Sequence, residues 1–365
     1  MNFSCNRAAL AEVLSALSEV IPSRSSKPIL QTILLRGDND GALTLAATDL
    51  EVALRYRLQP ETLSDPEELL LPGLKLCAVV RDEWADTIEF RSHGGRVEIT
   101  TQHGTYHLTA LTGEAFPPMP EIDPSNSVRI SGSDLAQAVH RTVFATSRSD
   151  TRFALNGVFV SVKKGTTEFA ASDTHRLSLV KKKVKNRSGV TGEGIVVTKG
   201  ITSVGKLAAA EDEVRLQLTG QQLLAESSSA ALATRLVDGQ FPRYQEVIPK
   251  DLQTAVTVER DLLLKALRVG GQLASEDTRC VSLAAGDNRL LVSVSGSEVG
   301  DAKMEIDAQI DGPEFSAAFN YVYIVDVLRI LDDEKVTIQF KDADHPARID
   351  VGDFTHVIMP IRPQG

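Results

Sequence analysis

The chain has 365 residues, a length that predicts two or three domains, and its composition, 42% hydrophobic and 24% charged, is that of a soluble globular protein. The formal net charge of −10 excludes a protein that binds nucleic acid over its whole surface, although it allows a local basic face. Three widely spaced cysteines exclude a disulfide scaffold and a cysteine-rich zinc module. No apolar stretch reaches the roughly 20 residues of a membrane span, and no secretion signal is recognised, so we expect a cytoplasmic protein.

The sequence repeats itself three times. Similar stretches occupy residues 43–54, 167–179 and 291–304, and Asp49, Asp173 and Glu298 hold the same place in them, 124 and 125 residues apart. Phe116 and Phe241, each followed by proline, are also 125 residues apart. This period is far above the 20–50 residues of solenoid repeats, so it predicts three similar domains, at 1–124, 125–251 and 252–365.

Each repeat begins with a helical pattern and continues with strands. In the first, apolar residues recur at i, i+3, i+4 and i+7 from Leu10 to Leu17. In the second, Ser133 is the expected N-cap of a helix that reaches Val143, and the third has a narrower stripe over 263–270. Alternating strands follow, as over 155–162, and a second short helix is expected near 74–82, 200–210 and 321–331. The class is α+β, with antiparallel sheets and two helices per domain.

Basic residues are concentrated on or beside these helices. Fewer carboxylates fall there: Glu12, Glu19, Asp134, Asp261 and Asp326. One interpretation is a basic face for an anionic partner, and the other is a set of ordinary amphipathic helices with solvated outer faces. The basic residues are Arg7, Lys75, Arg81, Arg141, Arg148, Lys199, Lys206, Lys265, Arg268 and Arg329.

Three motifs that might indicate catalysis fail on inspection. Residues 200–207, GITSVGKL, match a phosphate-binding loop except that Leu207 replaces the Ser or Thr that holds Mg²⁺. His103 and His107 lack an evident third ligand, which metal binding requires. Residues 172–175 contain Ser, Asp and His, but the members of a catalytic triad rarely lie so close in sequence. We therefore expect no enzyme, no cofactor and no metal.

A set of motifs in order along the whole chain resembles a known family, the bacterial DNA sliding clamp, which is the β subunit of DNA polymerase III. Single motifs are weak, but the set is specific. It comprises Pro28-Ile-Leu30, Thr48-Asp-Leu-Glu51, Leu155-Asn-Gly157, Ser172-Asp-Thr-His-Arg-Leu177, Leu236-Val-Asp-Gly-Gln-Phe-Pro-Arg-Tyr244, Phe319-Asn320 with Tyr323, and Met359-Pro-Ile-Arg362.

The resemblance implies three clamp domains per chain and a head-to-tail homodimer that forms a closed ring. Such a ring encircles double-stranded DNA without sequence preference and tethers the replicative polymerase for processivity in DNA replication. Implied partners are the polymerase α subunit, the clamp loader and other proteins with a clamp-binding motif, and no membrane is involved. Two alternatives stay open: a clamp paralogue with a narrower partner set, in repair or drug insensitivity, and an enzyme that uses residues 200–207.

The resemblance also implies three groups of site residues. The hydrophobic peptide cleft would comprise Leu155, Thr174, His175, Arg176, Leu177, Pro242, Val247, Asn320, Tyr323, Val357, Ile358, Met359, Pro360, Ile361 and Arg362, with the two arginines as its polar rim. The DNA-binding residues would be Arg24, Lys27, Lys75, Arg141, Arg148, Arg152, Lys199, Lys206, Lys265 and Arg268. The dimer interface would comprise Lys75, Tyr106, Leu108, Gln272, Leu273 and Glu298.

Four positions depart from the family's pattern. Glu246 stands where members carry Arg, which would reverse one charge at the cleft, and Gln272 replaces an apolar interface residue. Ser149 stands where a Gln touches duplex, and Pro363 lies beyond the usual chain end, where it supplies no backbone donor.

Overall fold

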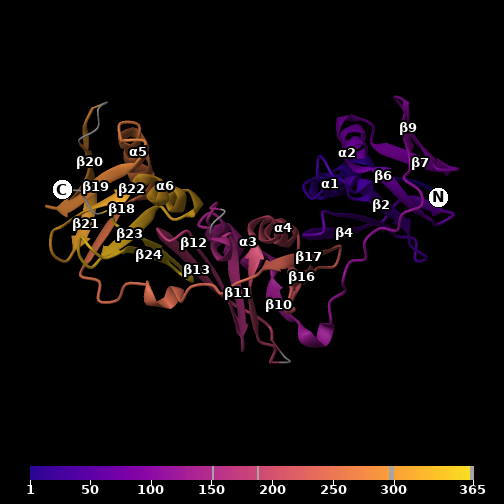
Figure 1. Ribbon diagram of the computed structural model, residues 1–365. Helices are drawn as coiled ribbons and strands as arrows, with labels where there is room; N and C mark the ends of the chain where they lie inside the picture. Colours follow the sequence, from indigo (N-terminus) through magenta and orange to yellow (C-terminus); the bar gives the residue numbers. More distant parts are fainter. Residues whose placement is uncertain (150–151, 187–188, 296–299, 362–365) are drawn as a thin grey trace. The chain divides into compact units, whose positions relative to one another are not determined.

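The computed structural model describes residues 1–149, 152–186, 189–295 and 300–361 (Figure 1). The chain forms two compact units. The N-terminal unit contains residues 1–133, 186 and 206–236, and the C-terminal unit contains residues 134–185, 189–205 and 237–361. The two units thus divide the middle repeat between them, and the domain boundaries expected from the repeats stay predictions.

Six α-helices lie in the described part of the chain, as the repeats predicted. They are α1 (Arg7–Ser18), α2 (Gly73–Asp82), α3 (Gly132–Val143), α4 (Thr198–Ala209), α5 (Arg260–Gly271) and α6 (Tyr321–Ile330). In α1 the predicted stripe is buried at Leu10, Leu14 and Leu17. Helices α1 and α2 pack together in the N-terminal unit, and α5 and α6 do so in the C-terminal unit (Figure 1).

Two local expectations were wrong. Helix α3 begins at Gly132, so Ser133 lies inside its first turn instead of capping it, and its hydroxyl lies 2.8 Å from that of Ser131. Only glycine fits at position 132, because a Cβ there would lie 1.8 Å from the carbonyl oxygen of Glu211. The strand expected from Leu155 begins at Gly157, because residues 153–155 form the short 3₁₀ helix η3 (Phe153–Leu155).

The N-terminal unit contains two antiparallel sheets. The five-stranded sheet has the order β5 (Thr62–Ser64), β1 (Asn2–Asn6), β7 (Thr87–His93), β8 (Arg96–Thr100) and β9 (Thr105–Thr109). The other sheet has the order β6 (Glu68–Pro72), β2 (Thr32–Gly37), β3 (Leu43–Thr48), β4 (Val52–Leu58), β17 (Ala230–Val237), β16 (Gln222–Glu226), β15 (Glu213–Leu218) and β10 (Val128–Ser131). The pairing of β4 with β17 makes one sheet from the first and second repeats.

The C-terminal unit joins the second and third repeats in the same way. Its strands pair antiparallel in the order β14 (Gly192–Val197), β11 (Gly157–Lys163), β12 (Thr166–Ser172), β13 (Arg176–Lys183), β25 (Phe354–Ile358), β24 (Ala347–Val351), β23 (Lys335–Phe340) and β18 (Thr254–Glu259). Strand β21 (Ala302–Asp311) pairs with β18 through its second half and with β20 (Arg289–Val294) through its first. Strands β19 (Cys280–Gly286) and β22 (Phe315–Asn320) complete the unit.

Candidate functional site

The predicted cleft residues converge where β13 meets β25 in the C-terminal unit. Arg176 pairs with Ile358, and Leu177 with Val357, in the antiparallel ladder. Beyond β25, the N–H of Met359 donates to the carbonyl oxygen of His175 at 2.8 Å, and the N–H of Ile361 donates to Ala318 of β22 at 2.7 Å. The end of the described chain therefore bridges the start of β13 and β22.

The predicted cleft residues divide into exposed and buried groups. Val247 and Met359 are 48% and 38% exposed, and Pro242, Thr174 and His175 are exposed as well. Asn320, Tyr323, Pro360 and Ile361 are half-buried. Arg362 lies outside the described residues.

Four predicted cleft residues lie in the core: Leu155, Leu177, Val357 and Ile358 are each at most 4% exposed. Leu177 and Val357 share a buried cluster with Tyr244, so they support the site from below and are not its accessible wall. The exposed apolar side chains of the set are those of Val247, Met359 and Pro242.

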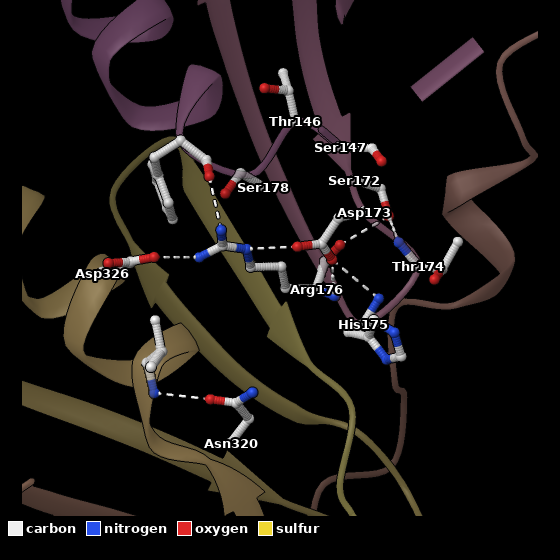
Figure 2. A network of polar contacts seen from close by, with 12 residues as sticks. Thr146, Ser147, Ser172, Asp173, Thr174, His175, Arg176, Ser178, Asn320 and Asp326 are labelled. Atoms are coloured by element: carbon white, nitrogen blue, oxygen red, sulfur yellow. Dashed lines mark hydrogen bonds and ion pairs between the residues drawn. The ribbon is translucent and has the colours of Figure 1, made fainter. Parts of the chain in front are cut away.

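Arg176 is a buried hub, and its assignment to the polar rim of the cleft was wrong (Figure 2). Its side chain is 9% exposed, because its guanidinium donates to Asp173 at 3.0 Å, to Asp326 of α6 at 2.7 Å and to the carbonyl oxygen of Phe144 at 2.8 Å. The guanidinium also lies over the ring of Phe144, at 5.3 Å, and over that of Tyr323, at 4.7 Å. One side chain thus connects β13, α6 and the segment after α3.

The carboxylate of Asp173 also fixes the turn before β13. Asp173 accepts hydrogen bonds from the backbone N–H groups of His175 and Arg176, both at 3.0 Å, while Thr174 has a positive φ of 80° (Figure 2). Ser172 donates its hydroxyl to the carbonyl oxygen of Arg176 at 2.7 Å. The Ser, Asp and His of this segment are therefore parts of a turn and are not a catalytic triad.

His356 is buried beneath the hub. Its Nδ1 lies 2.8 Å from the hydroxyl of Ser178. Burial, with a smaller contribution from the positive charge of Arg176, lowers the pKa of His356 to about 3. The imidazole is thus neutral in the folded protein near neutral pH.

Nine of the ten predicted DNA-binding residues are exposed: Arg24, Lys27, Lys75, Arg148, Arg152, Lys199, Lys206, Lys265 and Arg268. Among them, Lys206 forms an ion pair with Glu19 at 2.6 Å, and Arg152 donates to the hydroxyl of Thr174 at 2.9 Å. These contacts leave both side chains at the surface.

Arg141 is the exception, and the prediction that it binds DNA was wrong. The residue is 8% exposed, its guanidinium lies 3.5 Å from Asp353, and it sits over the ring of Phe354. A guanidinium held in this way is not accessible to a phosphate.

The predicted interface residues lie on β9 and just after α5. Tyr106 and Leu108 are half-buried on β9, which is the last strand of its sheet. In the C-terminal unit Gln272 is exposed and Leu273 is half-buried. Lys75 is exposed on α2, and Glu298 lies outside the described residues.

An aromatic cluster beside β9 escaped the sequence analysis. Trp84, the only tryptophan, is 70% exposed and packs against His103, with ring centroids 4.4 Å apart and the ring planes tilted by 31°. The carboxylate of Glu83 holds the cluster, because it accepts hydrogen bonds from the N–H of Trp84 and the hydroxyl of Tyr106 and lies 3.0 Å from Nδ1 of His103. Burial would raise the pKa of Glu83, but these hydrogen bonds, chiefly those from His103 and Tyr106, outweigh it and lower the pKa to about 2.

The remaining sequence motifs have structural roles. Residues 200–207 lie within α4, so they do not form a phosphate-binding loop. Within the described ranges, no group of three His, Cys, Asp or Glu residues could hold a metal ion. The helices of the same residues include none that is long and apolar enough to cross a membrane.

Comparison with known protein families accounts for nearly the whole chain. Models of the N-terminal, central and C-terminal domains of the DNA polymerase III beta subunit match residues 1–120, 129–243 and 245–362. The chain belongs to this family. The family consists of non-catalytic sliding clamps, so the enzyme alternative is excluded.

Individual members of the family are similar to this chain over their full length. The beta sliding clamps of Caulobacter vibrioides and Pseudomonas aeruginosa are 30% and 29% identical to this chain, and each alignment covers 99% of it and 100% of the relative. A crystal structure of the Pseudomonas aeruginosa clamp has a TM-score of 0.90 at 29% identity, again over 99% and 100% of the two chains. These relatives support a sliding clamp of DNA polymerase III and do not favour a paralogue with a narrower partner set.

Proposed function

We propose that two copies of this chain associate head to tail and close a ring around double-stranded DNA. The ring tethers the replicative polymerase, through its α subunit, and is placed on DNA by a clamp loader in the cytoplasm. Family membership supports this proposal, and so do two open strand edges, one in each unit. A head-to-tail interface forms a closed ring only if its rotation closes, which three similar domains per chain allow.

The first open edge is β9. Among the described strands it pairs only with β8, so the outer N–H and C=O groups of Thr105–Thr109 are available to another strand. Tyr106 and Leu108 project from this strand and are only half-buried. The exposed Trp84 adds apolar area through the cluster that Glu83 holds.

The second open edge is the first half of β21. Residues 302–307 pair with β20 on one side and with no other described strand. Met304 of this half lies against α5, since its Cε is 2.9 Å from where a Cβ on Gly270 would be. Gln272 and Leu273 follow directly after α5, so the open edge of β21 lies beside these two predicted interface residues. Pairing of β9 with β21 would extend one sheet into the partner.

The DNA-facing surface consists of exposed lysines and arginines on an acidic chain. Lys75 on α2, Lys199 and Lys206 on α4, and Lys265 and Arg268 on α5 are exposed. Contacts to phosphate bind DNA without reading its sequence. The net charge of the whole chain, −10, discourages other contacts with DNA, which suits a ring that slides.

The peptide cleft proposed for partner proteins consists of the exposed Val247, Met359, Pro242 and His175, with Tyr323 beside them. Glu246 at its margin is exposed and lies 3.6 Å from Arg243, so the charge expected there is partly compensated. A short extended peptide with two apolar side chains is the ligand that fits these residues.

Native mass in solution tests the assembly. Sedimentation equilibrium should give about 79 kDa, twice the 39.5 kDa of one chain. A species of 39.5 kDa that persists as the protein concentration is raised would contradict the ring.

A further inference from the structure

A cavity of about 920 Å³ in the C-terminal unit lies outside the predicted peptide cleft and is rich in arginine. Its wall comes from the segment after α3, the first turn of α4, the turn before β13, the residue before β19, and α6. Four arginines line it, Arg148, Arg176, Arg279 and Arg329, and we call it the arginine cavity. Only two of its lining residues, Arg176 and Tyr323, belong to the predicted cleft.

The cavity has an excess of positive charge. Its two carboxylates, Asp173 and Asp326, are both bound to Arg176. Arg148, Arg279 and Arg329 are exposed, and none of them forms an ion pair with any other described residue. Three guanidiniums that form no ion pair with a described carboxylate therefore line one cavity of an acidic protein.

Backbone contacts hold Arg279 in position at the cavity. Arg279 has a positive φ of 48°, in the left-handed region that few non-glycine residues adopt. Its N–H donates to Ser275 at 2.8 Å, and its carbonyl oxygen accepts from the N–H of Tyr321, at the start of α6, at 3.0 Å. Arg329 lies in the last turn of the same helix. The position of Arg279 is thus held from both sides.

A neutral donor is available beside the guanidiniums. The hydroxyl oxygen of Ser147 accepts a hydrogen bond from the N–H of Ser149 at 3.1 Å, which leaves its own hydrogen for a ligand. Guanidiniums and hydroxyls around a space of this size match the oxygens of a phosphate group, because the planar guanidinium binds two oxygens at once.

We propose that the arginine cavity binds phosphate groups. A duplex DNA backbone is one source, because Arg148 is both a cavity residue and a predicted DNA contact, and a small free phosphate is the other. The duplex source rests on the proposed clamp function, whereas binding of a small phosphate does not. The cavity also shares a wall with the peptide cleft, since the ring of Tyr323 lies under the Arg176 guanidinium and stacks on His175.

The test uses the full chain with two of these three arginines neutralised, Arg279→Gln with Arg329→Gln. The Lys replacement at both positions restores the charge, and Arg235→Gln, at an exposed arginine of β17 outside the cavity, controls for the loss of a surface arginine elsewhere. Calorimetric titration with pyrophosphate, at ionic strength held constant with chloride, should show affinity lower by about tenfold or more in the Gln variant. The Lys variant should recover part of that affinity, and the control should retain all of it.

A second measurement identifies the source of the phosphate. The affinity for a short linear duplex is measured against salt for the same variants. If the backbone occupies the cavity, the Gln variant should lose about two units of the slope of log K against log salt, since each phosphate contact contributes about 0.9. If only pyrophosphate binding changes, the ligand is a small phosphate.

Three results separate the proposals from each other. Unchanged pyrophosphate and duplex binding in the Gln variant, relative to Arg235→Gln, would overturn the phosphate site. Loss of binding to an acidic peptide, with both phosphate ligands unaffected, would overturn it in favour of a protein ligand. If the unaltered chain binds pyrophosphate but no duplex, the duplex source fails while the phosphate site stands, and retention on circular DNA tests the clamp function separately.

Discussion

Replacement of Arg176 by alanine tests whether the hub holds the second and third repeats together. The change removes hydrogen bonds to Asp173, Asp326 and the carbonyl oxygen of Phe144, and with them the contacts to two aromatic rings. Removal of one partner from a buried ion pair typically costs about 3–5 kcal/mol, because the other charge is left without compensation. The lower end of that range applies here, since the side chains of Asp173 and Asp326 are 15% and 26% exposed.

We therefore expect the free energy of unfolding to fall by about 3 kcal/mol, with a melting temperature lower by about 6–12 °C. Thermal unfolding followed by circular dichroism measures the change. Arg243→Ala is the matched control, because Arg243 is 88% exposed and its ion pair with Glu246 should contribute less than about 0.5 kcal/mol.

A double-mutant cycle isolates one contact of the hub. Arg176→Ala and Asp326→Asn, measured alone and together, should be non-additive by about 1 kcal/mol or more, because the two side chains meet at 2.7 Å with little solvent. An Arg176→Ala variant no less stable than Arg243→Ala would refute the role of Arg176 as a hub.

The dimer interface, the peptide cleft and the buried histidine can each be tested by substitution. Leu108→Asp with Leu273→Asp should convert dimers to monomers in sedimentation, because burial of each leucine contributes about 1.5–3 kcal/mol; persistent dimers would place the interface elsewhere. Val247→Ala with Met359→Ala should weaken binding of a short apolar peptide by about tenfold or more, while the native mass is unchanged. Calorimetric titration measures this affinity, and an unchanged value would contradict the assignment of these residues to the cleft. The pKa of His356 is about 3 in the folded protein and about 6.5 in the unfolded chain. Between these pH values the imidazole is protonated in the unfolded chain but neutral in the folded protein. The contribution of the neutral His356 to the free energy of unfolding is therefore complete above pH 6.5 and decreases from there to pH 3, by at most about 1.4 kcal/mol per pH unit. In His356→Phe the denaturant midpoint should no longer show this decrease. A pH profile of the midpoint identical to that of the unaltered chain would contradict the prediction.

Local sequence patterns predicted the elements that depend on local order. The apolar stripe from Leu10 to Leu17 became α1, and the repeated patterns located all six helices within a few residues. The N-cap of α3 was misplaced because the constraint at Gly132 comes from the carbonyl oxygen of Glu211, far along the chain. A sequence window does not contain that contact.

The resemblance predicted positions in the site but not their exposure. Leu177 was assigned to the cleft wall, yet it packs under Tyr244 and Val357 in the core. Arg141 belongs to the basic surplus counted over all the helices, but its side chain turns toward Asp353, more than two hundred residues later. Which face of a helix is solvated depends on such long-range packing, so charge counts alone could not separate Arg141 from its exposed neighbours.

The arginines of the hub and cavity show the same limit. Arg176 reaches Phe144 and Asp326, which are 32 and 150 residues away in sequence. Arg279 and Arg329 stand in no recognised motif, and only the fold brings them to one cavity with Arg148. Carboxylates flank both arginines in the sequence, with Glu276 and Asp277 before Arg279 and Asp332 and Asp333 after Arg329, so no local pattern singles them out.

Retention on circular DNA tests the central claim, a closed ring around duplex, most directly. The chain is loaded onto nicked circular DNA with a clamp loader and passed through a gel-filtration column at a salt concentration that abolishes its binding to a short linear duplex. Phosphate contacts alone weaken steeply with salt, whereas a closed ring is retained by topology. The account predicts that the chain stays with the circle and is released when one restriction cut linearises it. Release from the intact circle at that salt, or retention after linearisation, would contradict it.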